Sequence, residues 1–222
     1  MSGDAQPALV YAFDPLSAWC YAYRPEILEI RSILQHALPL RIVCGGMITD
    51  ARERPIREDQ ERIELEMGEV LRRSGIGFGK SFVQSLLREG SWVRRSEPAC
   101  RAVLIAQELD GDRALDFANR LSHATFWAGL RSDQPETISL AATSTGYDGE
   151  KLLALWRTPE AAERTRLAFA EARRRGVDAF PSLFLAEGDV WRPVCTGYVR
   201  AREAIPKINA ALERRVANSG SA

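Results

Sequence analysis

The sequence predicts an α/β protein in which a small central sheet is interrupted by a long helical segment. Short apolar runs at residues 8–13 and 40–44 flank a helical pattern, and strand character returns only at residues 182–194. Between about residues 55 and 175, the apolar residues recur at helical spacing throughout. With 222 residues, of which 45% are hydrophobic and 27% charged, the chain is long enough for a sizeable core.

The first unit is predicted to be a strand, a helix and a second strand. Residues 8–13 include the uninterrupted apolar run Leu9-Val10-Tyr11-Ala12-Phe13, which is typical of a buried strand. Residues 20–37 carry an apolar stripe near the helical period, and Pro39 ends that helix. Residues 40–44 alternate and are closed by Gly45-Gly46. A crossover of this length suits a parallel pair of strands.

The middle of the chain is predicted to be helical. Ser96-Glu97-Pro98 supplies a helix start, with a capping serine and a proline in the first turn. Arg173-Arg174-Arg175-Gly176 supplies a helix stop, because basic residues precede a glycine. The predicted helices cover residues 58–73, 96–109, 114–128, 135–143, 149–156 and 159–174.

The last unit is predicted to be a hairpin and a helix. Its strands are residues 182–185 and 190–194, and the helix covers residues 200–216. A β-α-β unit and a β-β-α unit on one sheet make the thioredoxin arrangement. We therefore predict a thioredoxin-like domain formed by residues 8–46 and 176–216. A helical insertion domain would cover residues 50–175.

Composition argues against several classes of partner. Lys plus Arg (30) equals Asp plus Glu (30), so no global field favours nucleic acid or an anionic membrane. The apolar runs are far shorter than a membrane span, and the N-terminal residues do not have the pattern of a signal peptide. Reduced thiols in a cytoplasm are then the default. Nothing in the sequence fixes an oligomeric state.

The cysteines and histidines do not form a metal-binding pattern. The cysteines make no C-x-x-C pair and lack the spacing of a zinc site; they are Cys20, Cys44, Cys100 and Cys195. The two histidines, His36 and His123, are far apart and have no companion ligands. The sequence therefore predicts no metal site.

The segment from Asp14 to Tyr21 carries the candidate chemistry. It joins the first strand to a helix start, where unpaired backbone N–H groups and the helix dipole stabilise a thiolate and lower its pKa. Ser17 stands where a Cys-x-x-Cys pair would have its first sulfur, so only Cys20 remains. Asp14 either tunes this site electrostatically or starts the turn before Pro15.

A second segment of interest is Phe180-Pro181, directly before the third predicted strand. A proline cannot donate a ladder hydrogen bond, so it belongs at the first residue of a strand. Taken alone this pair is a weak signal. Its combination with the Asp14–Tyr21 segment and with the helical insertion is more specific.

These segments resemble the DsbA-like branch of the thioredoxin superfamily, in particular its cytoplasmic, FrnE-like members. Those proteins carry Asp-Pro-x-Cys-x-Trp-Cys-Tyr after the first strand, and this chain has Asp14-Pro15-Leu16-Ser17-Ala18-Trp19-Cys20-Tyr21. The other matching segments are Gly45-Gly46-Met47, Ser96 to Val103, Gly176-Val177, Phe180-Pro181 and Thr196-Gly197-Tyr198. The resemblance spans nearly the whole chain, and its departure is Ser17 in place of the attacking cysteine.

The resemblance implies a site. Ser17 and Cys20 would be its catalytic residues, and Asp14, Trp19, Phe180 and Pro181 would bind substrate. The Phe180–Pro181 bond would be cis, with Pro181 in van der Waals contact with Ser17 and the Phe180 backbone open to an extended peptide. No covalently bound cofactor is implied. The partner would be a thiol-containing peptide or glutathione, the latter as cosubstrate.

Three functions stay open at this point. The first is a thiol–disulfide oxidoreductase relative, similar to protein disulfide isomerase, with a degenerate Ser-x-x-Cys site working through Cys20 or helped by Cys100. The second is a glutathione-dependent transferase or isomerase. Kappa-class glutathione transferases and 2-hydroxychromene-2-carboxylate isomerases carry Ser-Pro-x-Ser, similar to Asp14-Pro15-Leu16-Ser17, and there Ser17 would orient the glutathione thiolate. The third is a non-catalytic module that binds thiols or peptides.

Overall fold

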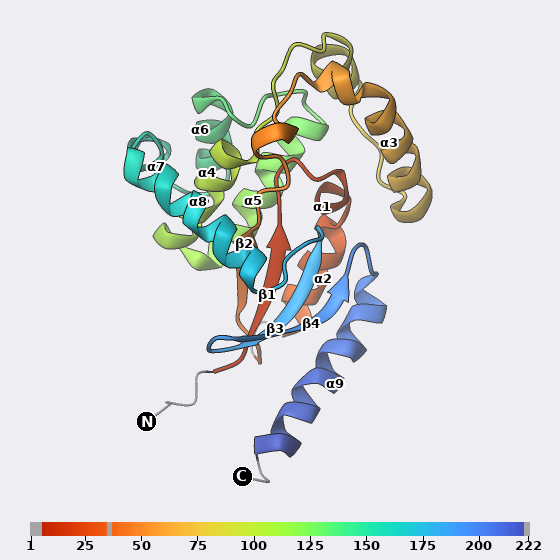
Figure 1. Ribbon diagram of the computed structural model, residues 1–222, viewed down its shortest axis with the longest axis vertical. Helices are drawn as coiled ribbons and strands as arrows, with labels where there is room; N and C mark the ends of the chain where they lie inside the picture. Colours follow the sequence, from red (N-terminus) through yellow and green to blue (C-terminus); the bar gives the residue numbers. More distant parts are fainter. Residues whose placement is uncertain (1–5, 35–36, 220–222) are drawn as a thin grey trace.

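The computed structural model describes residues 6–34 and 37–219. Within these residues, one four-stranded sheet has the order β2-β1-β3-β4 (Figure 1). Its strands are β1 (Ala8–Phe13), β2 (Leu40–Cys44), β3 (Ser182–Glu187) and β4 (Val190–Thr196). β1 is parallel to β2 and antiparallel to β3, and β4 completes an antiparallel hairpin with β3. Segments far apart in the chain therefore share one sheet, as the β-α-β and β-β-α units predict.

The two faces of β1 enter different parts of the core. Leu9, Tyr11 and Phe13 belong to the larger apolar cluster, together with helix residues such as Ile27. The alternate residues, represented by Val10, belong to a smaller cluster on the opposite face. Side chains of a strand alternate between faces, so a strand buried on both sides is apolar at every position.

The predicted helix over residues 20–37 is divided in two. The structure has α1 (Ala18–Ala22) and α2 (Arg24–Leu34), while residues 35–36 lie outside the described part of the chain. Pro25 has no N–H to donate to the carbonyl of Tyr21. The Arg24 Nε donates to that carbonyl instead, at 2.9 Å. The helix dipole that acts at Ser17 therefore belongs to the five-residue helix α1 rather than to a long helix.

The helical insertion lies between β2 and β3, as predicted. Its elements are η1 (Asp50–Arg52), η2 (Ile56–Asp59), α3 (Gln60–Ser74), the π-helical η3 (Phe82–Arg88), α4 (Ser96–Leu109), α5 (Gly111–Phe126), α6 (Pro135–Ser144), α7 (Gly149–Trp156) and α8 (Pro159–Arg174). The chain ends in α9 (Ala201–Ser219). The three short η elements were not predicted, and the domain boundaries stay a prediction. In the part of the chain that the structure describes, no helix has the length and apolar character needed to cross a membrane.

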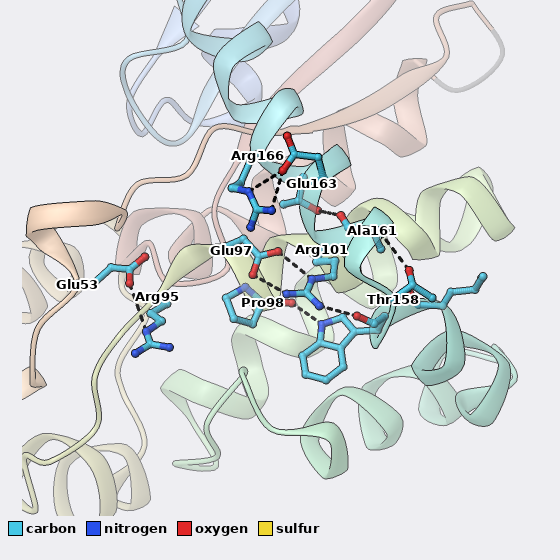
Figure 2. A network of polar contacts seen from close by, with 12 residues as sticks. Glu53, Arg95, Glu97, Pro98, Arg101, Thr158, Ala161, Glu163 and Arg166 are labelled. Carbon is cyan, nitrogen blue, oxygen red and sulfur yellow. Dashed lines mark hydrogen bonds and ion pairs between the residues drawn. The ribbon is translucent and has the colours of Figure 1, made fainter.

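Polar contacts fix the helices of the insertion to one another (Figure 2). The Arg101 guanidinium forms a two-point ion pair with Glu97 on α4 and donates to the carbonyl of Trp156 on α7 at 2.6 Å. In return, the Trp156 indole N–H donates to the carbonyl of Pro98 at 2.8 Å. This reciprocal pair holds the end of α7 against the start of α4.

The Gln107 side chain connects the insertion to the edge strand of the sheet. Gln107 on α4 accepts from the backbone N–H of Ile42 at 2.7 Å, and its amide N–H donates to the carbonyl of Ile42 at 3.0 Å. The side-chain amide thus occupies the place of a neighbouring strand at the centre of β2. Such protection limits strand-to-strand association at an edge.

Candidate functional site

Asp14 holds the loop that follows β1. One carboxylate oxygen accepts from the N–H of Leu16 at 2.9 Å, and the other accepts from the N–H of Met47 at 2.8 Å. The Cys100 thiol also lies 3.7 Å from the second oxygen. Burial raises the pKa of Asp14, and the hydrogen bonds oppose that rise. The Asp14 carboxyl group has no exposed surface and shapes the loop through these bonds; a role in substrate binding stays a prediction.

Ser17 is the N-cap of α1. Its backbone is extended, and its Oγ accepts from the backbone N–H of Cys20 at 3.2 Å. This bond uses the hydroxyl oxygen as an acceptor, so the O–H is still able to donate, and the Cys20 sulfur is one acceptor within its reach. The residue is only 2% exposed. The helix start therefore presents a hydroxyl donor where the resemblance expects a cysteine.

Cys20 is a buried thiol. None of its surface is exposed, and burial raises its pKa to about 12, a rise that hydrogen bonding to Asp14 and Ser17 only partly opposes. Cys20 lies within α1 rather than at its exposed start, so desolvation outweighs the helix dipole. At neutral pH the group is the neutral thiol, not the thiolate expected of an activated sulfur. The other three cysteines are also buried and free of disulfides.

Trp19 lies at the rim of the site, half-buried between α1, α3 and the segment after β4. The Arg73 guanidinium is 5.3 Å from its ring, and the Tyr198 ring is 6.0 Å away. Arg73 also approaches the Tyr198 carbonyl, at 3.4 Å. The Tyr198 hydroxyl donates to Glu26 at 2.9 Å. These contacts give the rim an aromatic surface beside a cation.

The Phe180–Pro181 bond is cis, the geometry that the resemblance implies. Pro181 is buried, and its carbonyl accepts from the N–H of Gly197 at 2.8 Å. Neither backbone polar group of Phe180 is hydrogen-bonded among the described residues. Gly45 is needed on the other side, because a Cβ there would come within 2.4 Å of the Phe180 ring. The glycine after β2 thus makes room for the Phe180 ring.

The sheet register brings the two segments to the same end of the molecule. Ala12 is paired with Ser182, so the residues after β1 and those before β3 leave the sheet together. The Ser17 loop and the Phe180-Pro181 pair therefore lie beyond the same end of these two inner strands. Contact between Ser17 and Pro181 themselves stays a prediction.

Two residues that support the loop were not singled out for this role. Ser122 on α5 donates to the carbonyl of Pro15 at 3.2 Å, and Ser96 on α4 accepts from the N–H of Ile48 at 2.9 Å. Ser96 was expected to cap α4, but its N-cap is Arg95, and Ser96 is the first helical residue. Both serines contact the site through backbone groups of distant segments, which sequence spacing does not reveal.

The described residues contain no group of three or more His, Cys, Asp or Glu side chains that could hold a metal ion. His36 lies outside those residues. His123 stacks on Trp127, with ring centroids 6.0 Å apart. The site geometry thus consists of a hydroxyl, a buried thiol, a half-buried indole and an unpaired backbone segment.

No protein-family model and no curated protein matches the sequence. The fold, however, is similar to solved structures over nearly the whole chain. A protein from Nitrosomonas europaea, proposed to be a protein disulfide isomerase, is 23% identical with a TM-score of 0.84, over 94% of this chain and 98% of that one. The cytosolic disulfide reductase DsbM from Pseudomonas aeruginosa is 25% identical with a TM-score of 0.77, over 94% of this chain and 99% of that one.

A third neighbour carries a different activity. A 2-hydroxychromene-2-carboxylate isomerase is 16% identical with a TM-score of 0.58, over 96% of this chain and 98% of that one. Together these likenesses confirm the thioredoxin-like α/β fold with a large helical insertion. The fold is likewise similar to that of DsbA oxidoreductases, for example NmDsbA1 from Neisseria meningitidis, which is 14% identical with a TM-score of 0.54, over 100% of this chain and 89% of that one.

Proposed function

We propose that this protein binds glutathione or a similar thiol peptide and uses Ser17 to hold the thiolate of that ligand for a transferase or isomerase reaction. The observation that carries this proposal is the division of roles in the Ser-x-x-Cys segment. Ser17 caps α1 with a hydroxyl still able to donate, while Cys20 is a buried thiol whose pKa is raised to about 12. The sulfur nucleophile then comes from the ligand rather than from the chain.

The rest of the site suits an extended peptide with an anionic sulfur. The unpaired N–H and C=O of Phe180 can pair with a peptide backbone, as in strand addition. Trp19 offers an apolar face, and Arg73 beside it offers a cation to a ligand carboxylate. Ser17 donates to the sulfur, and a hydrogen bond to a charged group is the stronger kind.

The neighbours support the same reading. DsbM from Pseudomonas aeruginosa has been solved with glutathione, in a structure that matches this chain with a TM-score of 0.75 and 25% identity. The isomerase neighbour shows that this fold also serves reactions outside disulfide exchange. A dithiol reductase needs two sulfurs in reach of each other, and resolving a mixed disulfide requires a thiolate. Ser17 removes one sulfur, and the raised pKa of Cys20 disfavours the other.

Calorimetric titration with reduced glutathione tests the binding step. We expect saturable binding in the micromolar to millimolar range, weakened in the variant Trp19→Ala. The matched control is Trp127→Ala, which removes a tryptophan that is 51% exposed on α5's C-cap, outside the site. Absence of binding would contradict the proposal and favour a protein thiol as partner. Insulin reduction close to that of a Cys-x-x-Cys protein would favour the oxidoreductase instead.

A further inference from the structure

A second cleft, separate from the Ser17 site, lies on the helical side of the molecule. It has a volume of about 470 Å³ and lies between the start of α2, the middle of α5 and the residue that follows α6. Its polar lining includes Arg24, Asn119, Arg120 and His123, and Leu28 supplies part of its apolar lining. The glutathione proposal uses none of these residues.

Two arginines in this cleft have no acidic partner. Arg24 is half-buried, and its contacts are the Tyr21 carbonyl at 2.9 Å and the Tyr21 ring, 4.1 Å from the guanidinium. Arg120 is exposed. Neither arginine forms an ion pair with any residue in the ranges 6–34 and 37–219. A half-buried guanidinium is normally paired with a carboxylate, because desolvating an unpaired charge is costly. Besides its contacts with Tyr21, Arg24 therefore keeps an uncompensated charge that an anion in the cleft would neutralise.

Asn119 gives an independent indication of a missing ligand. It is 8% exposed, and neither its side-chain oxygen nor its side-chain nitrogen has a hydrogen-bond partner among the described residues. Buried polar side chains are nearly always hydrogen-bonded, so a buried amide without partners needs an explanation. The same side chain lines the cleft, but its amide oxygen and nitrogen are themselves covered from solvent, so a molecule bound in the cleft reaches them only after the Asn119 side chain turns outward.

The charge balance around the cleft favours an anion. Asp116 is its acidic lining residue, and Arg31 neutralises that carboxylate through two contacts of 3.0 and 3.1 Å. The pKa of His123 is lowered by partial burial and then by the nearby charges of Arg24 and Arg120. The contribution of the two arginines to the lowered pKa of His123 indicates a positive environment, which the Asp116 carboxylate does not neutralise.

We propose that this cleft binds a small molecule with an oxyanion, a phosphate or a carboxylate, on an apolar or aromatic body. The oxyanion lies between Arg24 and Arg120, where guanidinium groups supply charge-assisted hydrogen bonds. Once turned outward, the Asn119 amide donates to the same group or pairs with a polar atom beside it. The apolar body lies against Leu28. Pockets of this size accommodate small molecules with a few polar anchors.

Binding is tested with three probes on the full chain. Phenyl phosphate and benzoate share an aromatic ring and differ in the oxyanion, while inorganic phosphate has no apolar body. We expect saturable binding of phenyl phosphate or benzoate, and the tighter of the two identifies the headgroup. Arg120→Gln and Asn119→Ala should each weaken that binding about tenfold or more, the loss typical of one charge-assisted hydrogen bond.

The control is Arg157→Gln, which removes an exposed arginine on the same insertion that lies outside the cleft and has no ion pair among the described residues. It should leave binding unchanged. Equal losses in Arg120→Gln and Arg157→Gln would overturn the proposal, because they would show general charge attraction. Failure of both aromatic probes to saturate would also overturn it, whatever glutathione does.

Thermal denaturation of Asn119→Leu gives a second readout. Leucine has the branching of asparagine and removes the unpartnered amide; because leucine is larger, Asn119→Ala is measured beside it, and the more stable of the two variants is compared with the native protein. If the amide serves a ligand, the ligand-free variant unfolds at the same or a higher temperature than the native protein. A clear loss of stability would show that Asn119 has a structural partner, and it would remove the independent support for the site.

Discussion

Replacing Ser17 by alanine removes a hydroxyl to which we assign two roles, a helix cap and a donor to the ligand thiolate. The cap on the Cys20 N–H, at 3.2 Å, is lost, and N-cap serines contribute about 1 kcal/mol to the free energy of unfolding. The donor to the ligand thiolate is lost as well. A hydrogen bond to a charged group is worth about 1.5–3 kcal/mol. Since about 1.4 kcal/mol is a factor of ten in rate, turnover should fall roughly 10- to 150-fold.

The assay is turnover of a model electrophile, such as 1-chloro-2,4-dinitrobenzene, with glutathione as cosubstrate. Glutathione affinity is measured in parallel by calorimetry, because the backbone of Phe180 and the face of Trp19 stay intact in the variant. We expect kcat to fall more than affinity. The pKa of the bound glutathione thiol, followed by its ultraviolet thiolate absorbance, should rise when the donor is removed.

A matched control isolates the cap. Thr158 caps α8 by accepting from the N–H of Ala161, also at 3.2 Å, and lies in the insertion (Figure 2). Thr158→Ala should cost similar stability and leave glutathione turnover unchanged. If Ser17→Ala and Thr158→Ala behave alike in both assays, Ser17 is only a helix cap and the proposed chemistry is refuted.

Three further outcomes follow from the structure. A thiol reagent should label less than about one cysteine per native chain at neutral pH, and four after unfolding in guanidinium, because all four thiols are buried. Gly45→Ala should displace the Phe180 ring and weaken glutathione binding, whereas Gly68→Ala, with no atom within 4 Å of its Cβ, should bind normally. Asp59→Asn should lose about 2 kcal/mol in a urea titration at pH 7. The ion pair with Arg54 is the main factor that lowers the Asp59 pKa to about 2, so this loss should vanish as pH falls from about 4 to about 2.

The fold was predictable because its boundaries coincide with strong local signals. The uninterrupted apolar run and the alternating run before Gly45 predicted β1 and β2 with the bounds that the structure has. The break between α1 and α2 was missed, although Pro25 was visible. The apolar stripe continues through the break, and periodicity alone does not show a missing hydrogen-bond donor.

The sequence predicted which residues belong to the candidate site, but not how far each of their side chains is exposed to a ligand. The resemblance selected Ser17, Cys20 and Phe180 without showing which of them a ligand can touch. Cys20 belongs to an apolar cluster that also includes residues of α4 and β2, which are distant in sequence. Asn119 could not be selected at all, because an unpartnered amide is visible only when its surroundings are known.

The buried position of Cys20 also limits what restoring the missing cysteine would achieve. Ser17→Cys returns a sulfur to the helix start, where a low thiol pKa is expected, but it exchanges a strong N-cap acceptor for a weak one. A new thiol there could attack a disulfide, yet Cys20 would have to resolve the product, and its pKa of about 12 keeps it protonated. We therefore expect mixed disulfides with glutathione to accumulate, visible by mass spectrometry, with only a small gain in insulin reduction. Reduction at the rate of a Cys-x-x-Cys protein would show that Cys20 becomes accessible, and the oxidoreductase reading would then replace the glutathione-dependent one.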